Sequence, residues 1–165
     1  MNSPVVIHKV KAEFGWMSNM SRHRVTYAGE EYGSAEALFQ SLRFEEADIQ
    51  AEIRTQRKPM AAKLTAHSYE EWMTTTPCSD ADLEHMRLVL RLKLEQHPEL
   101  LEKLFGTGES HIVEDCTHRQ RGTGLFWGAA RQLDGTWQGE NWLGQLWMEL
   151  RAEMLLKRGQ PIQQA

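Results

Sequence analysis

The sequence predicts a mainly helical α+β protein with a few short strands in one domain. Apolar residues recur at helical spacing in several segments, and short alternating segments beside turn residues lie between them. The chain has 165 residues, a length typical of one domain with a substantial core. We therefore expect a single domain over residues 1–165, with its core at about 14–157.

The segment that organises this prediction is a helix that begins at Ser34. Serine is a preferred residue for this position because its hydroxyl accepts a hydrogen bond from an amide of the first turn. Ala35, Leu38 and Leu42 then fall on one face of the helix. These apolar residues predict a buried stripe.

A second face of this helix carries Glu36, Gln40 and Arg43, at positions i, i+4 and i+7. An acid, an amide and a cation in this order are typical of a helix that lines a polar pocket. They also fit a solvated outer face, because these residue types are usually exposed. The tail of the chain is needed to choose between the two interpretations.

The segments before the helix predict short strands. A strand is expected at residues 5–13, a loop at 14–20, and a second strand at 24–27. Residues 28–31 supply a turn, which predicts a small hairpin that leads into Ser34.

Further helices follow. One is expected over 46–54, and Pro59 suits the first turn of another. Ser79 or Asp80 can cap a long helix, and Asp82 suits its first turn electrostatically. The apolar stripe of that helix is formed by Leu83, Met86, Leu90 and Leu94.

Lys93 lies at the edge of this stripe and has two possible positions. Lysines there usually extend their ammonium group to solvent. If the side chain instead points into a cavity, desolvation lowers the pKa of the amine and makes it nucleophilic.

The last third of the chain predicts a short helix from Pro98 to Gly106, a strand at 111–114 and a closing helix at about 141–157 that Gly159 ends. The apolar side of the closing helix consists of Leu143, Leu146, Trp147, Leu150 and Met154. Residues 115–141 read as a loop rich in Gly, Arg and Trp. Such a loop is too long for a plain connection, so we expect it to be functional or mobile.

Composition and motif spacing exclude several classes of function. The net charge of −4 leaves no basic footprint, so any contact with nucleic acid would need a local patch. Cys78 and Cys116 predict neither a disulfide framework nor a cysteine metal site, and the histidines show no ligand spacing. The N-terminus has no long apolar run, so we expect no signal peptide, no membrane span and a cytoplasmic location.

No zinc motif, phosphate loop, dinucleotide-binding glycine pattern or serine nucleophile elbow is present. The polar residues that remain are carboxylates, aromatic residues, glycines and a few cations. They suit a nucleotide-like ligand, with aromatic faces for stacking and arginines or amides for phosphate. The same residue types are common in other proteins, so they indicate no single function.

The order of several short motifs is more specific, and it resembles the NADAR family, which is linked to NAD and ADP-ribose chemistry. The resemblance covers most of the chain, from Phe14 to Arg151. The motifs are Phe14-Gly15, Ser18-Asn19, Tyr32-x-Ser34-x-Glu36-x-x-x-Gln40, Lys93-x-x-Gln96-His97-Pro98-Glu99-Leu100, Thr107-Gly108, Val113-Glu114, Trp127-Gly128 and Gly139-x-Asn141-x-Leu143-Gly144-x-x-x-Met148-x-x-Arg151.

This resemblance implies a mainly helical α+β fold and an N-glycosidase, without cofactor or metal, that hydrolyses N-glycosidic bonds to ribose phosphates. The substrates it implies are early riboflavin-biosynthesis intermediates or ADP-ribose attached to guanine in nucleic acid. We assign Glu36 and Lys93 to catalysis and expect Glu36 and Trp127 to face one sugar-sized pocket. The residues expected to bind substrate are Trp16, Asn19, Ser34, Gln40, Arg43, Trp127, Gly128 and Asn141.

Two positions depart from the family pattern. Arg43 stands where related sequences often carry a lysine, and an arginine cannot readily form a Schiff base. Gly124 stands where many carry an aspartate, and residues 117–123 form a longer loop than usual. Three explanations stay open: Asp115 replaces the acid in space, the arginine-rich loop recruits an anionic substrate such as a nucleic acid, or it is a plain surface loop. An alternative function is therefore a non-catalytic module that binds ADP-ribose or a related nucleotide; the oligomeric state is not predicted.

Overall fold

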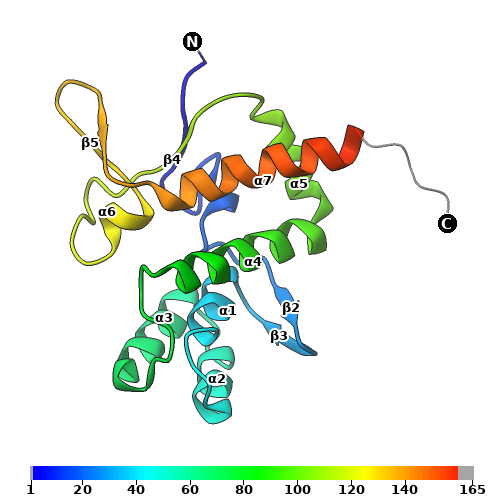
Figure 1. The fold of residues 1–165 in the computed structure, drawn as a ribbon, viewed down its shortest axis with the longest axis vertical. Coiled ribbons are helices and arrows are strands. Elements are labelled where there is room, and N and C mark those ends of the chain that lie inside the picture. Colours follow the sequence, from blue (N-terminus) through cyan, green and yellow to red (C-terminus); the bar gives the residue numbers. More distant parts are fainter. Residues whose placement is uncertain (1, 160–165) are drawn as a thin grey trace. The chain divides into compact units, whose positions relative to one another are not determined.

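The computed structural model describes residues 2–159 (Figure 1). Contacts within the chain define two compact units, which we call the N-terminal unit (residues 7–98) and the C-terminal unit (residues 1–6 and 99–165). The single-domain prediction stays a prediction. Helices joined by a few short strands confirm the predicted α+β class.

The N-terminal unit is built around helix α1 (Ala35–Ser41), which packs against the three other α-helices of this unit. All residues of α1 are buried. Around it lie α2 (Ala47–Arg54), α3 (Pro59–Ser68) and α4 (Asp80–Gln96), the 3-10 turns η1 (Gly15–Met17) and η2 (Glu70–Trp72), and the hairpin β2 (Val25–Tyr27) and β3 (Glu30–Tyr32).

The helices begin where the sequence predicts. The Ser34 hydroxyl accepts a hydrogen bond from the amide of Ala37 at 3.1 Å. The Ser79 hydroxyl accepts one from the amide of Asp82 at 3.2 Å, so Ser79 and not Asp80 is the cap of α4. Pro59 is the first residue of α3, a position that needs no amide proton.

The predicted hairpin is also confirmed. β2 and β3 pair antiparallel with Val25 opposite Tyr32. Ala28 and Gly29 form the turn, and both have positive φ, 51° and 80°. Two such residues give the turn geometry that matches the twist of a two-stranded ribbon.

The C-terminal unit contains α5 (Pro98–Gly106), β4 (Ile112–Glu114), α6 (Gly124–Trp127), β5 (Ala130–Arg131), β6 (Trp137–Gln138) and α7 (Trp142–Gly159). Helix α7 packs on β4, and β4 pairs with β1 (Val5–Ile7). The Val5 amide donates to the carbonyl of His111 at 2.8 Å. β5 and β6 form a second antiparallel hairpin.

Two sequence predictions were wrong in extent. The first strand ends at Ile7, because the chain turns at Lys9, whose carbonyl accepts from the Ala12 amide at 2.9 Å. The segment 115–141 is not a plain loop, since it contains α6 and the β5–β6 hairpin. These elements are too short to show a helical or strand period in the sequence. Among the helices described, none is long and apolar enough to cross a membrane.

Candidate active site

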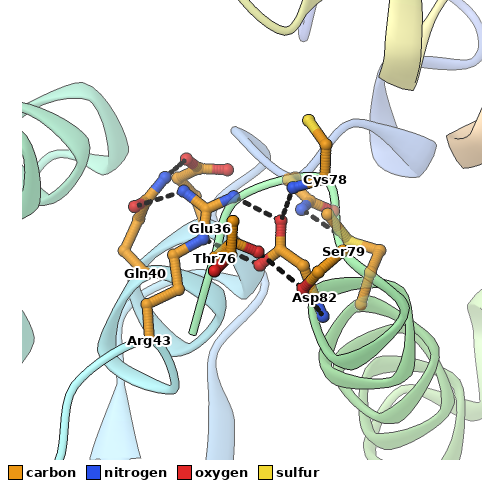
Figure 2. Close-up of polar contacts among 9 residues, drawn as sticks. Glu36, Gln40, Arg43, Thr76, Cys78, Ser79 and Asp82 are labelled. Atoms are coloured by element: carbon orange, nitrogen blue, oxygen red, sulfur yellow. Dashed lines mark hydrogen bonds and ion pairs between the residues drawn. The ribbon is translucent and has the colours of Figure 1, made fainter. Parts of the chain in front are cut away.

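The predicted polar stripe is buried, so its interpretation as a solvated outer face was wrong; Glu36 and Gln40 lie on α1, and Arg43 lies two residues past its end. Glu36, Gln40 and Arg43 are 6%, 2% and 4% exposed, because α1 is surrounded by the other helices of its unit. One Glu36 carboxylate oxygen accepts a hydrogen bond from Gln40 Nε2 at 2.7 Å. The Gln40 carbonyl in turn accepts one from Arg43 Nη1 at 3.3 Å. Figure 2 shows this chain of contacts.

Asp82, at the start of α4, completes the chain. Arg43 Nε and Nη2 donate to its two carboxylate oxygens at 2.8 and 2.7 Å, and the Cys78 amide donates to one of them at 2.9 Å (Figure 2). The Arg43 guanidinium also lies 4.5 Å from the Phe39 ring centroid. From the sequence, only a favourable interaction of Asp82 with the helix dipole was expected. Its pairing with Arg43 could have been inferred only if Arg43 had been known to be buried, because a buried arginine needs a buried acid.

These contacts favour a structural role for Arg43. Its Nε, Nη1 and Nη2 all donate to protein acceptors. One of these acceptors is the Gln40 side chain, which in turn donates to the Glu36 carboxylate. The prediction that Arg43 binds substrate directly stays a prediction. The Ser34 hydroxyl likewise serves as the helix cap.

Lys93 is fully buried, so the expectation that it extends to solvent was wrong. Its Nζ donates to the carbonyl oxygen of Ser18 at 3.1 Å and to Ser21 Oγ at 2.7 Å. With acceptors inside the protein, the ammonium has no need to reach water. Burial lowers the pKa of Lys93 from its ordinary 10.5 to about 7.

The segment from Trp16 to Ser21 connects this amine to the acid-bearing helix. The carbonyl of Ser18 accepts from Lys93, and the carbonyl of the next residue, Asn19, accepts from the amide of Glu36 at 3.1 Å. The side-chain amine of Lys93 and the main-chain amide of Glu36 therefore bond to consecutive peptide units. Trp16, 8% exposed, belongs to the same segment, and its carbonyl accepts from the Ser21 hydroxyl at 3.3 Å.

The Asn19 side chain is buried and only partly hydrogen-bonded, and its expected contact with substrate stays a prediction. Its Nδ2 lies 3.1 Å from the sulfur of Met86. Its Oδ1 is buried and has no hydrogen-bond partner among residues 2–159. A buried amide oxygen without a donor is costly, and a substrate hydroxyl or amine at this position would satisfy it.

In the C-terminal unit, Asn141 acts as a clamp on β4. Its Nδ2 donates to the carbonyl of Ile112 and its Oδ1 accepts from the amide of Glu114, both at 2.9 Å. Asn141 has a φ of 54°, a conformation that asparagine adopts more readily than most residues. These contacts explain the residue structurally, and its expected contact with substrate stays a prediction.

The Trp127-Gly128 step lies against the same strand. A Cβ at Gly128 would come within 2.6 Å of the Glu114 carbonyl oxygen, so only glycine fits there. Its amide donates to the carbonyl of Gly124 at 2.8 Å. The half-buried Trp127 ring stands edge-on to Phe126, with centroids 4.9 Å apart. Because Glu36 and Trp127 belong to different units, the expectation that they share a pocket stays a prediction.

The structure gives a physical reason for the departure at Gly124. A Cβ there would lie 1.9 Å from the carbonyl oxygen of Arg119, which belongs to the longer loop. The loop therefore leaves no room for a side chain at position 124, where the family resemblance implies an aspartate. The Asp115 carboxylate accepts the amide of Thr117 at 2.9 Å within a local turn, and its replacement of the missing acid stays a prediction.

Two further motif residues of the C-terminal unit meet each other. The buried Arg151 donates through Nη1 to the Thr107 hydroxyl at 2.7 Å. Burial lowers the pKa of Arg151 from its ordinary value. Within residues 2–159, no group of three or more His, Cys, Asp or Glu side chains is placed to hold a metal ion.

Known proteins resemble this chain over most of its length. N-glycosidase YbiA of Escherichia coli (strain K12) is 29% identical over 146 residues, which cover 88% of this chain and 85% of that protein. Riboflavin biosynthesis protein VVA0006 of Vibrio vulnificus (strain YJ016) is 25% identical over 154 residues, 93% of this chain. The match spans only 39% of that longer protein.

The fold is shared as well. The NMR structure of E. coli YbiA superposes with a TM-score of 0.79 at 25% identity, covering 100% of this chain and 94% of that one. A family model described as the NADAR domain matches residues 7–155, which include every predicted site residue. The chain belongs to the NADAR domain family.

Proposed function

We propose that this protein is an N-glycosidase that hydrolyses the bond between C1 of a ribose phosphate and the nitrogen of a base or amine. The proposal rests mainly on two neighbouring carbonyls: that of Ser18 accepts from the side-chain amine of the buried Lys93, and that of Asn19 accepts from the main-chain amide of Glu36, whose carboxylate is also buried. Membership in a family with named N-glycosidases supports the same reaction.

Glu36 is assigned the electrostatic part of the reaction. Cleavage of a glycosidic C1–N bond places positive charge on the sugar, and a nearby carboxylate stabilises that charge or activates the attacking water. Within residues 2–159, Gln40 Nε2 is the one hydrogen-bond donor to this carboxylate. The rest of its acceptor capacity is available for a ribose hydroxyl or a water molecule.

Lys93 is assigned the nucleophile. With a pKa of about 7, a large fraction of the side chain is a neutral amine at neutral pH, which an ordinary lysine is not. Its Nζ would bond to C1 as the C1–N bond breaks, and water would later release the ribose phosphate. Asn19 Oδ1 would accept a hydrogen bond from the substrate in the same region.

The remaining predicted residues have supporting roles in this proposal. Trp16 and Trp127 would stack on the leaving base, and the main chain near Gly128 would contact phosphate. Arg43 would act by fixing Gln40. The name of the Vibrio relative favours a riboflavin-pathway intermediate as substrate, with ADP-ribosylated guanine as the other candidate. The cytoplasmic location stays a prediction.

A mass-spectrometric screen tests the proposal. The protein is incubated with N-ribosyl phosphates of the riboflavin pathway and with ADP-ribosylated nucleic acid, and Glu36→Gln serves as the matched control. We expect free base or amine together with a ribose phosphate from the wild type only. Intact substrate after prolonged incubation, with measurable binding, would instead establish the non-catalytic binding module.

A further inference from the structure

A hydrogen-bonded path leads away from Lys93. Its Nζ donates to Ser21 Oγ at 2.7 Å, and Ser21 Oγ lies 3.0 Å from Nδ1 of His23. Lys93 is fully buried, Ser21 is 2% exposed, and His23 is half-buried. The path therefore runs from an enclosed amine, through a hydroxyl, to an imidazole that reaches the surface.

The imidazole at the end of the path is held in place. The His97 ring stands edge-on to the His23 ring, with centroids 5.1 Å apart and an interplanar angle of 81°. His97 Nε2 lies 2.6 Å from the carbonyl oxygen of Arg24, and because a carbonyl only accepts, this nitrogen must carry a proton. The Gln96 side chain also bonds both the amide and the carbonyl of Thr26, at 2.7 and 2.8 Å. These hydrogen bonds connect the C-terminal end of α4 to β2, and so they fix the position of the His97 ring that contacts His23.

A path of this kind gives the protonated fraction of the enclosed Lys93 a route for its proton. An ammonium group must lose a proton before its nitrogen can bond to carbon. The Ser18 carbonyl accepts a hydrogen bond from Lys93 but cannot pass a proton on. The Ser21 hydroxyl accepts from Nζ, and its single proton can turn from the Trp16 carbonyl oxygen, 3.3 Å away, to the nearer His23 Nδ1 at 3.0 Å. An imidazole, with an ordinary pKa of about 6.5, suits proton transfer near neutrality.

We propose that Ser21 and His23 are positioning residues that form a proton relay for Lys93. The inference rests on the proposed glycosidase function. The Lys93 ammonium gives a proton to Ser21 Oγ while the hydroxyl gives its own proton to His23 Nδ1, which leaves a neutral amine and an imidazolium. The imidazolium then releases this proton to solvent.

The steps that follow need no reagent other than the substrate and one water molecule. Nζ bonds to C1, the C1–N bond breaks, and the departing nitrogen takes a proton from the alkylated lysine. Opening of the ribose ring gives an imine between C1 and Nζ. Addition of one water molecule releases the ribose aldehyde and restores the free amine.

The experiment isolates the amine step with a defined probe, ribose 5-phosphate, whose open form carries an aldehyde. The full chain is incubated with this sugar and cyanoborohydride, and the rate of adduct formation on Lys93 is followed by peptide mass spectrometry. The variants are His23→Asn, which keeps a hydrogen-bonding group but cannot take the proton, His23→Ala, which leaves room for added imidazole, Ser21→Ala and Ser21→Thr. His67→Gln, at an exposed position on α3, is the matched control.

We expect labelling to slow by about 10²-fold in His23→Asn and Ser21→Ala, as is typical for loss of a proton-transfer group, while the concentration of sugar that gives half-maximal rate stays within about threefold. Ser21→Thr keeps the hydroxyl and should label at a rate near that of the wild type, as should His67→Gln. Added imidazole should restore the rate of His23→Ala, which loss of structure alone would not allow.

Unchanged labelling in both His23→Asn and Ser21→Ala would overturn the relay. A slow His23→Ala variant that imidazole does not restore would overturn it as well, since a structural role would then explain the loss. If one variant fails to fold, as judged from its melting temperature, the other decides. A wild type that labels no lysine yet releases base in the substrate screen would refute the relay and leave the glycosidase proposal standing.

Discussion

The guanidinium of Arg43 meets the carboxylate of Asp82 in two hydrogen bonds, from Nε to Oδ1 at 2.8 Å and from Nη2 to Oδ2 at 2.7 Å. The two side chains are 5% and 0% exposed. This pair joins the segment just after α1 to α4, and Arg43 also donates to Gln40, which in turn donates to Glu36. The geometry of the proposed catalytic acid therefore depends on an ion pair that is itself out of contact with solvent.

Breaking this pair should be costly. Arg43→Met leaves a buried carboxylate without its cation, and we expect the free energy of unfolding to fall by about 3–5 kcal/mol. Arg43→Met combined with Asp82→Asn should cost less than the sum of the two single changes, because the amide carries no charge and can still accept from the Cys78 amide. Urea denaturation of the four proteins measures this; strict additivity would mean that the pair is not coupled.

Arg43→Lys tests the departure from the family pattern. A lysine cannot make two parallel hydrogen bonds to Asp82, so we expect a loss of stability of about 1–2 kcal/mol and no gain in turnover. Substrate turnover and unfolding should be measured on the same preparation. A clear rise in turnover would place the family's reactive amine at position 43 and remove that role from Lys93.

The burial of Lys93 predicts a particular dependence of stability on pH. Below about pH 7 the side chain is charged in both the folded and the unfolded chain, so the full cost of burying the charge is present. Between about pH 7 and its ordinary pKa of 10.5 the unfolded chain binds more protons, so stability should rise with pH from this group, by up to about 1.4 kcal/mol per unit.

Lys93→Met removes this effect. The variant should be more stable than the wild type at pH 6, and its advantage should shrink as the pH rises toward about 10. The exposed Lys103, changed in the same way, is the control and should leave the shape of the curve unaltered. Parallel curves for wild type and Lys93→Met from pH 6 to 10 would show that the amine titrates normally.

Gly124→Ala tests why the family's aspartate is missing here. Its Cβ would lie 1.9 Å from the Arg119 carbonyl oxygen, so the backbone of the loop must move, and we expect a loss of about 1–3 kcal/mol. A Cβ at Gly106, in the same unit, meets nothing within 4 Å, so Gly106→Ala should be neutral or slightly stabilising. Equal melting temperatures for the two variants would disprove the steric explanation.

Local chemistry explains which parts of the fold could be predicted from the sequence. Ser34 and Ser79 predicted their helices because a cap is set by a hydroxyl and the amides next to it in the chain. The short helix α6 and the β5–β6 hairpin could not be predicted, because they span too few residues for a period to develop. Their shape depends on contacts such as those of Gly128 with β4.

In the candidate site, too, some features could be predicted from the sequence and others depend on tertiary packing. The spacing of Glu36, Gln40 and Arg43 predicted a shared face, but only tertiary packing decides whether that face is dry or solvated. The burial of Lys93 could not be predicted either, because it depends on a carbonyl and a hydroxyl in a segment far away in the chain. Ser21 and His23 carry no motif of their own, so sequence alone could not connect them to Lys93.

Borohydride trapping during turnover distinguishes a covalent intermediate on Lys93 from direct attack by water. The wild type is mixed with the N-ribosyl phosphate identified in the substrate screen, reduced with borohydride, and digested for peptide mass spectrometry. We predict a ribosyl phosphate adduct on Lys93, no adduct in Lys93→Arg, and neither adduct nor released base in Glu36→Gln. Continued release of base with no adduct on any lysine would contradict a covalent role for Lys93, and undiminished turnover in Glu36→Gln would remove Glu36 from the mechanism.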